Sequence, residues 1–70
     1  MVLRSADELA PLIRARRREL GLTQEALAEL VGASRSLIVV LESGKKPVRL
    51  ETTLTILHTL GMDLEVRVRG

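Results

Sequence analysis

The sequence contains no cysteine and no phenylalanine, tyrosine or tryptophan. Without cysteine it has no disulfide and no thiolate ligand for a metal. Without aromatic rings it lacks the stacking platforms on which single strands and RNA are bound. No apolar run approaches the roughly 20 residues that cross a bilayer, and no apolar signal core opens the chain. We therefore expect a cytoplasmic bacterial protein with no membrane, metal or other cofactor association.

The composition predicts one small domain. The chain has 70 residues, of which 46% are hydrophobic, and its formal net charge is +2. A core of this size is marginal alone, and oligomerisation is a common remedy. Basic clusters suit phosphate, although charge runs on helices are more often simply solvated. The basic residues form two groups: Arg14, Arg16, Arg17 and Arg18, and then Lys45, Lys46 and Arg49.

Capping and stop signals predict four helices, over about residues 6–20, 24–31, 35–43 and 50–60. Ser5 and Glu8 have the spacing of a capping box for the first helix. Pro11 either bends this helix or opens a later one, and we favour the bent helix. The apolar spacing predicts one buried face for the first helix and one for the fourth. These faces consist of Leu9, Leu12, Ile13 and Leu20, and of Leu50, Leu54, Leu57 and Leu60.

Residues 23–43 have the pattern of a helix-turn-helix. Thr23 and Ser34 are N-caps for its two helices, and Gly32 allows the chain to reverse between them. Ala28 is small enough for the helices to cross closely. The apolar positions with core spacing are Leu27, Val31, Ile38 and Leu41. A plain helical hairpin is the alternative, but the ordered set of constraints favours a motif whose second helix enters the DNA major groove.

Residues 62–69 alternate between apolar and charged side chains, which predicts a β-strand. A lone strand leaves its backbone groups unpaired. Two copies that pair antiparallel about Val66 would place Glu65 opposite Arg67 and Asp63 opposite Arg69. Pairing with residues 2–4 of the same chain is the alternative. The expected dimer strand comprises Met62, Asp63, Leu64, Glu65, Val66, Arg67, Val68 and Arg69.

A longer pattern carries a family resemblance. R-x-x-R-x-x-x-G-L-T-Q, from Arg14 to Gln24, and the following A-L-A, G-A-S-R-S and L-E-S-G-K resemble the phage-repressor/Cro (XRE) family. The next L-x-x-x-L-x-x-L-x-x-L-G and the alternating end further resemble HipB-like antitoxins. The resemblance covers about residues 5–69. It implies a mainly α, four-helix lambda-repressor-like DNA-binding domain over residues 1–70, with a C-terminal β-strand in an intersubunit antiparallel ribbon.

The resemblance also implies roles for individual residues. Gln24 would contact phosphate, and Arg17 would pair with Glu42. Ser34, Arg35, Ser36 and Val39 would face base edges, and Arg35 can hold guanine through two hydrogen bonds. Val39 and Val40 offer no hydrogen bond, so we expect narrow specificity with affinity carried largely by phosphate contacts. The expected DNA-binding residues are Thr23, Gln24, Ser34, Arg35, Ser36, Val39, Val40, Lys45 and Lys46.

An enzyme is not expected. His58 is the single histidine and has no second ligand at a metal-binding spacing. Lys45 and Lys46 follow Gly44 without the remaining features of a phosphate loop. The sequence instead predicts a homodimeric repressor of a palindromic double-stranded operator, and the resemblance implies an autoregulating type II antitoxin. The alternative is a protein–protein module that chiefly neutralises a HipA-like kinase toxin, with DNA binding secondary.

Overall fold

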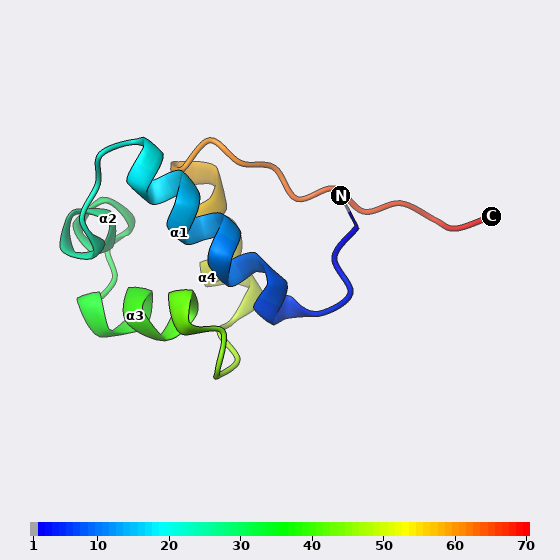
Figure 1. The fold of residues 1–70 in the computed structure, drawn as a ribbon, viewed down its shortest axis with the longest axis horizontal. Helices are drawn as coiled ribbons and strands as arrows, with labels where there is room; N and C mark the ends of the chain where they lie inside the picture. The colour runs from blue at the N-terminus through cyan, green and yellow to red at the C-terminus, as the bar shows by residue number, and fades with distance from the viewer. Residues whose placement is uncertain (1) are drawn as a thin grey trace.

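The computed structural model describes residues 2–70 and is built from helices (Figure 1). The elements follow the order η1 (Ala6–Glu8), α1 (Leu9–Glu19), α2 (Gln24–Val31), α3 (Arg35–Ser43) and α4 (Leu50–Thr59). The predicted mainly α class and the four helices are confirmed. The starts of α2 and α3 coincide with the predicted ones, because a capping side chain precedes each helix.

The first helix begins differently from the prediction. Ala6–Glu8 form a 3-10 turn, and α1 starts only at Leu9. Ser5 does not cap the helix, because its hydroxyl bonds the carboxylate of Asp7. The Glu8 carboxylate accepts a hydrogen bond from the backbone N–H of Arg4 at 2.6 Å. Pro11 lies in the first turn of α1, where a backbone N–H has no intrahelical acceptor, so it costs no helical hydrogen bond.

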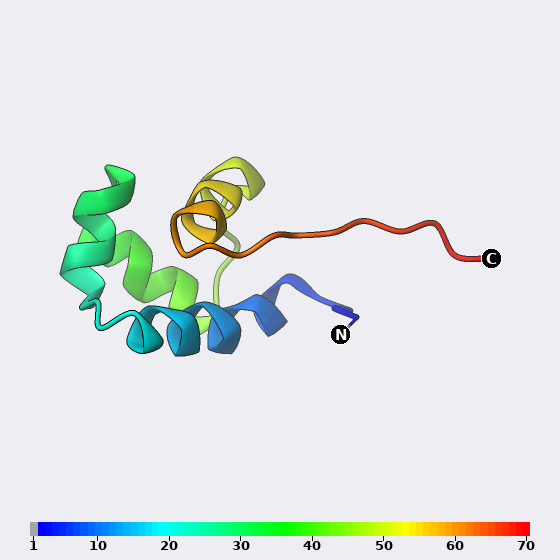
Figure 2. The ribbon, with the colours of Figure 1, turned by 90° about the horizontal axis from the view of Figure 1, so that it is seen from above.

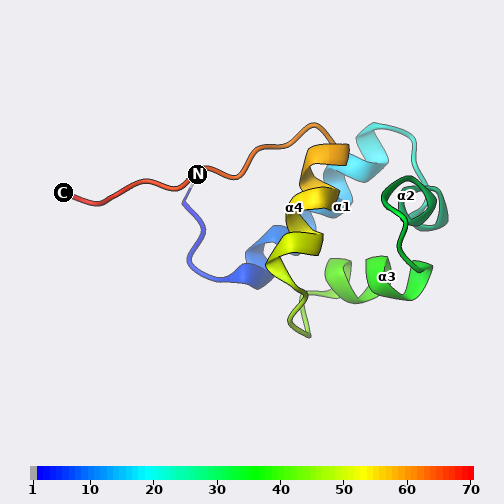
Figure 3. The ribbon, with the colours of Figure 1, turned by 180° about the vertical axis from the view of Figure 1, so that it is seen from behind.

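The core lies between the four helices. Seen from behind, α4 lies over α1 (Figure 3), and the Arg16 Nε donates to the Leu60 carbonyl at 2.8 Å, which ties the two together. Ala28 is buried beside Leu27 in α2, as its small size predicts. Leu20, just after the last residue of α1, was expected in the core but is exposed. The largest fully buried side chains are Ile13, Leu27, Ile38, Ile56, Leu57 and Leu60.

The predicted buried stripe of α4 is partly wrong. Leu50 is 63% exposed, and Leu54 is only half-buried. Thr53 and Ile56 are buried together with Leu57 and Leu60. Thr53 satisfies its hydroxyl by donating to the Arg49 carbonyl at 3.0 Å, so a buried polar side chain is tolerated at this position.

The C-terminal tail (residues 62–70) leaves the helices and runs outward as an extended segment (Figures 1 and 2). Met62 still packs against the core, whereas Val66 and Val68 are 90% and 96% exposed. The predicted strand is not found within residues 2–70, because a ladder needs a second backbone and none lies beside the tail. No backbone hydrogen bond joins the tail to residues 2–4 either.

Candidate nucleic-acid interface

Two side-chain caps and one glycine shape the helix-turn-helix. The Thr23 hydroxyl accepts from the N–H of Ala26 at 3.0 Å, and the Ser34 hydroxyl accepts from the N–H of Leu37 at 3.1 Å. Gly32 has a φ of 70°, the left-handed conformation that glycine adopts without steric cost. The turn therefore spans residues 32–34, and α3 starts at the surface with its first residues exposed.

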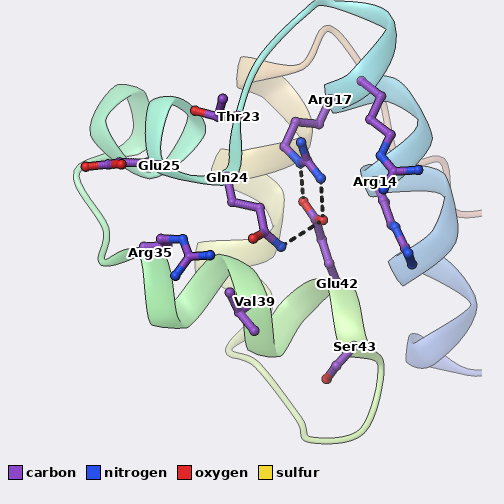
Figure 4. A pocket seen from close by; sticks show the side chains of 10 residues that line it. Arg14, Arg17, Thr23, Gln24, Glu25, Arg35, Val39, Glu42 and Ser43 are labelled. Atoms are coloured by element: carbon purple, nitrogen blue, oxygen red, sulfur yellow. Dashed lines mark hydrogen bonds and ion pairs between the residues drawn. The ribbon is translucent and has the colours of Figure 1, made fainter.

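A hollow of about 560 Å³ lies where α1, α2 and α3 meet (Figure 4). The second half of α1 forms one wall and α3 forms the other, while the first turn of α2 closes the top. Its lining combines arginines with small polar side chains. The lining residues are Arg14, Arg17, Arg18, Thr23, Gln24, Glu25, Arg35, Val39, Glu42 and Ser43.

A buried ion pair links the two walls. Arg17 Nε and Nη2 donate to the two carboxylate oxygens of Glu42 at 2.7 and 2.9 Å, and Arg17 Nη1 donates to the Leu22 carbonyl at 2.8 Å. The side chains of Arg17 and Glu42 are only 9% and 4% exposed. The hydrogen bond to Glu42 raises the pKa of Arg17, although burial acts in the opposite direction. The guanidinium therefore stays charged throughout the physiological range.

Gln24 joins this pair from α2. Its Nε2 donates to a Glu42 carboxylate oxygen at 3.3 Å (Figure 4). One amide hydrogen is used in this way, and the NH₂ group has a second one. The first residue of α2 is thus fixed at the top of the hollow by the same carboxylate that binds α1.

The faces of α3 separate its side chains into three groups. Ile38 and Leu41 are buried in the core, whereas Arg35 and Val39 turn toward the hollow. Ser36 is exposed but lies outside the hollow lining. Val40 was expected to be exposed, but it is half-buried and also lies outside the lining.

The structure places the two loop lysines apart from the other predicted residues. Lys45 and Lys46 follow α3 and line a second hollow of about 430 Å³, together with Asp7 and Leu50. Arg35 lies at the opposite end of α3. At 1.5 Å of rise per residue, the two ends of this helix are roughly 12 Å apart. The nine predicted DNA-binding residues therefore divide between the hollow (Thr23, Gln24, Arg35 and Val39), the turn before α3 (Ser34), the rest of α3 (Ser36 and Val40) and the loop after it (Lys45 and Lys46).

Four residues of the hollow were predicted neither as DNA-binding residues nor as the structural pair Arg17 and Glu42. Arg14 and Arg18 have the i, i+4 spacing of one helix face, but the sequence does not say what that face opposes. Ser43 follows Arg35 by eight positions and therefore shares its side of α3. No sequence signal distinguishes Glu25 from an ordinary exposed acid in the first turn of a helix.

The net charge of the protein is concentrated in this hollow. Its lining includes four arginines and two glutamates, an excess of two positive charges. The whole chain has 11 basic and nine acidic side chains. The seven basic and seven acidic side chains elsewhere therefore balance. Since Glu42 neutralises Arg17, the excess comes from Arg14, Arg18 and Arg35 set against Glu25.

Comparison with known proteins identifies the family of this fold. A family model described as a helix-turn-helix domain matches residues 8–69. The chain belongs to this helix-turn-helix family. An uncharacterized HTH-type transcriptional regulator of Methanothermobacter thermautotrophicus is 48% identical over 52 residues, 74% of this chain and 75% of its own length. The HTH-type regulator y4mF of Sinorhizobium fredii is 31% identical over 68 residues, 97% of this chain and 90% of its own length.

Solved structures show the same fold. A chain of the HipA-HipB-O2-O3 complex superposes with a TM-score of 0.86 at 24% identity, over 100% of this chain and 99% of that one. A structure called MDT Protein gives the same values. The chain is thus of the transcriptional-regulator class rather than an enzyme. Across residues 2–70, no helix is long and apolar enough to span a membrane.

Proposed function

We propose that this helix-turn-helix protein is a sequence-specific transcriptional repressor that binds double-stranded DNA. One observation carries the proposal: the leading end of α3 is exposed beside a hollow that contains the entire net positive charge. Excess cationic charge binds phosphate, and an exposed helix start suits entry into the major groove. Operator DNA lies in the cytoplasm of a bacterial cell, where we expect the protein to work.

The predicted residues take four roles in this proposal. Arg35, Ser36, Val39 and Val40 face the base edges, with Arg35 as the residue that reads guanine. Ser34 holds the start of α3 in place through its cap. Thr23 and Gln24 meet phosphate at the start of α2. The remaining two, Lys45 and Lys46, contact the backbone beyond the end of α3.

We further propose that the protein acts as a homodimer joined through its C-terminal tail. The exposed valines of the tail support this, because period-two patterning gives the segment an apolar face that one chain leaves uncovered. Antiparallel pairing about Val66 would satisfy both the backbone and the charges. A two-fold dimer presents two copies of α3 about 34 Å apart and therefore favours a palindromic operator.

The fold shared with the HipA-HipB-O2-O3 complex supports a narrower proposal, that the protein is an autoregulating antitoxin. The alternative is a module that chiefly neutralises a HipA-like kinase toxin. Leu30 of α2 favours it, because this leucine is 62% exposed and lies outside the hollow. A kinase-like reading frame next to the gene, and a complex between the two products, would support either form of the antitoxin assignment.

The deciding experiment is a footprint on the DNA upstream of the protein's own gene. We expect one protected palindrome and an affinity that falls steeply as salt rises. Arg35→Ala should reduce the preference for this site over a scrambled duplex by about 1–3 kcal/mol for each guanine contact. Arg4→Ala, on the exposed N-terminal arm, is the control for charge. Uniform binding by wild-type protein to both duplexes would contradict sequence-specific repression.

A further inference from the structure

The four arginines of α1 divide into two pairs with different surroundings. Arg16 donates to the Leu60 carbonyl and to Glu19, and Arg17 is bound by Glu42 and the Leu22 carbonyl. Arg14 and Arg18 are exposed and both line the hollow. Within residues 2–70, the side chain of neither arginine has an ion-pair or hydrogen-bond partner. Two arginines therefore hold the fold together, and two point their charge into the hollow.

Helix stability explains only one member of this second pair. Like charges at i, i+4 repel and destabilise a helix by about 0.2–0.5 kcal/mol. A cation in the last turn is favoured by the helix dipole, which accounts for Arg18. Arg14 lies more than a turn earlier, where this effect has faded. An anion placed between the two guanidinium groups would turn their repulsion into attraction.

On the wall opposite Arg14 and Arg18 the acid is Glu42, which Arg17 already neutralises, and Glu25 of α2 is the other acid of the lining. Arg35 is the first residue of α3, where a cation opposes the helix dipole, and the first turn contains no acid. At the top of the hollow, Gln24 has an amide hydrogen that Glu42 does not use. Cations and N–H donors thus converge from three helices on a space of about 560 Å³.

We propose that Arg14 and Arg18 bind one DNA phosphate across the hollow from Arg35, so that α1 is a third DNA-contacting element outside the helix-turn-helix. The inference rests on the proposed function, because it assumes that duplex DNA approaches α3. Guanidinium groups bind phosphate oxygens through two parallel hydrogen bonds. The backbone strand that borders the groove occupied by α3 then enters the hollow, while Arg35 reaches past it to the bases.

This assignment predicts that Arg14 and Arg18 contribute to the affinity for DNA but not to the preference between sequences. Removing one phosphate contact should lower the slope of log affinity against log salt by about 0.9. Arg14→Gln and Arg18→Gln should therefore weaken binding to the footprinted duplex and to a scrambled duplex by the same factor. Because the two arginines share one phosphate, the double variant should reduce the slope by about 0.9 for each bound protomer. Preference between the two duplexes should stay at the wild-type value.

Arg4→Gln is the matched control, because it removes the same charge from a residue outside the hollow. Glutamine and arginine have similar helix propensities, so α1 should keep its stability, which thermal unfolding by circular dichroism checks. A double variant with the wild-type salt slope would overturn the inference while the proposed function stands. Wild-type protein that does not bind duplex DNA would overturn both.

Thermal unfolding in inorganic phosphate distinguishes a site for the DNA backbone from a site for a small anion. Phosphate stabilises folded proteins generally because it is excluded from their surface, so we expect the melting temperature to differ between sodium phosphate and sodium chloride of equal ionic strength by the same amount in wild-type protein and in the double variant. A phosphate-specific stabilisation that the Arg14→Gln, Arg18→Gln double variant abolishes, with an unchanged salt slope for DNA, would assign the hollow to a free anion and contradict the inference.

Discussion

At the scale of single residues, the Glu42 carboxylate holds the interface together. It binds Arg17 of α1 and Gln24 of α2, and it belongs to α3. The pKa of Arg17 is raised in the folded protein. A raised pKa means that the stabilisation from this cation is fully present below the ordinary arginine value, and is lost only as pH rises through the folded value. The arginine thus keeps its charge in any buffer used for DNA binding.

Removing the charge of Glu42 should be costly. Glu42→Gln keeps the shape of the side chain but leaves the Arg17 guanidinium buried without a counter-charge. We expect a loss of about 3 kcal/mol in the free energy of unfolding, measured by urea denaturation followed by circular dichroism. Glu19→Gln is the control, since this acid forms an exposed pair with Arg16 and should cost less than about 0.5 kcal/mol. Equal effects of both variants would contradict the structural role of Glu42.

At the scale of elements, the two glycines that end α2 and α3 differ in their surroundings. Gly32 and Gly44 both have left-handed backbones, with φ of 70° and 66°. A Cβ on Gly32 would meet nothing within 4 Å, whereas one on Gly44 would lie 3.3 Å from the Cβ of Ala10. The end of α3 therefore approaches α1 closely.

This difference in surroundings predicts which of the two glycine substitutions destabilises the protein more. Gly32→Ala should destabilise by about 1 kcal/mol, from backbone strain alone. Gly44→Ala adds the tight contact with α1, so it should cost measurably more in the same urea titration. Because both variants remove the same conformational freedom of glycine from the unfolded chain, their difference isolates that contact. An equal destabilisation, or a smaller one for Gly44→Ala, would contradict the packing at this helix end.

The helices also show which features of the fold could be predicted from the sequence. The starts of α2 and α3 could be predicted because Thr23 and Ser34 act locally, through bonds to N–H groups three residues ahead. The face of α4 could not, because leucines at helical spacing fix a stripe but not which of two neighbouring stripes meets the core. Tertiary packing buries Thr53 and Ile56 and exposes Leu50.

The candidate site also has features that the sequence predicts and features that only the fold reveals. The start of α3 and the side of Arg35 follow from helical geometry. The hollow requires knowledge that α1 lies opposite α3, and a run of arginines contains no such information. Only the fold separates Arg14 and Arg18 from Arg16 and Arg17.

At the scale of the whole molecule, charge substitutions in the C-terminal tail test the proposed dimer. Glu65→Arg would place like charges opposite each other twice in a ribbon centred on Val66. We expect sedimentation equilibrium to show a several-fold weaker dimer, and the further change Arg67→Glu to restore it by exchanging the pair. His58→Gln, on the exposed surface of α4, is a control outside the tail. Dimerisation that is indifferent to both changes would exclude this register.

The uneven placement of charge has a last consequence, for diffusion. Apart from the hollow, the protein is formally neutral, so its net positive charge lies on one side, which is the side that we propose faces DNA. In the field of a polyanion such a molecule experiences a torque before any contact forms. Encounters are thereby biased toward productive orientations, within a Debye length of about 8–10 Å in cellular salt.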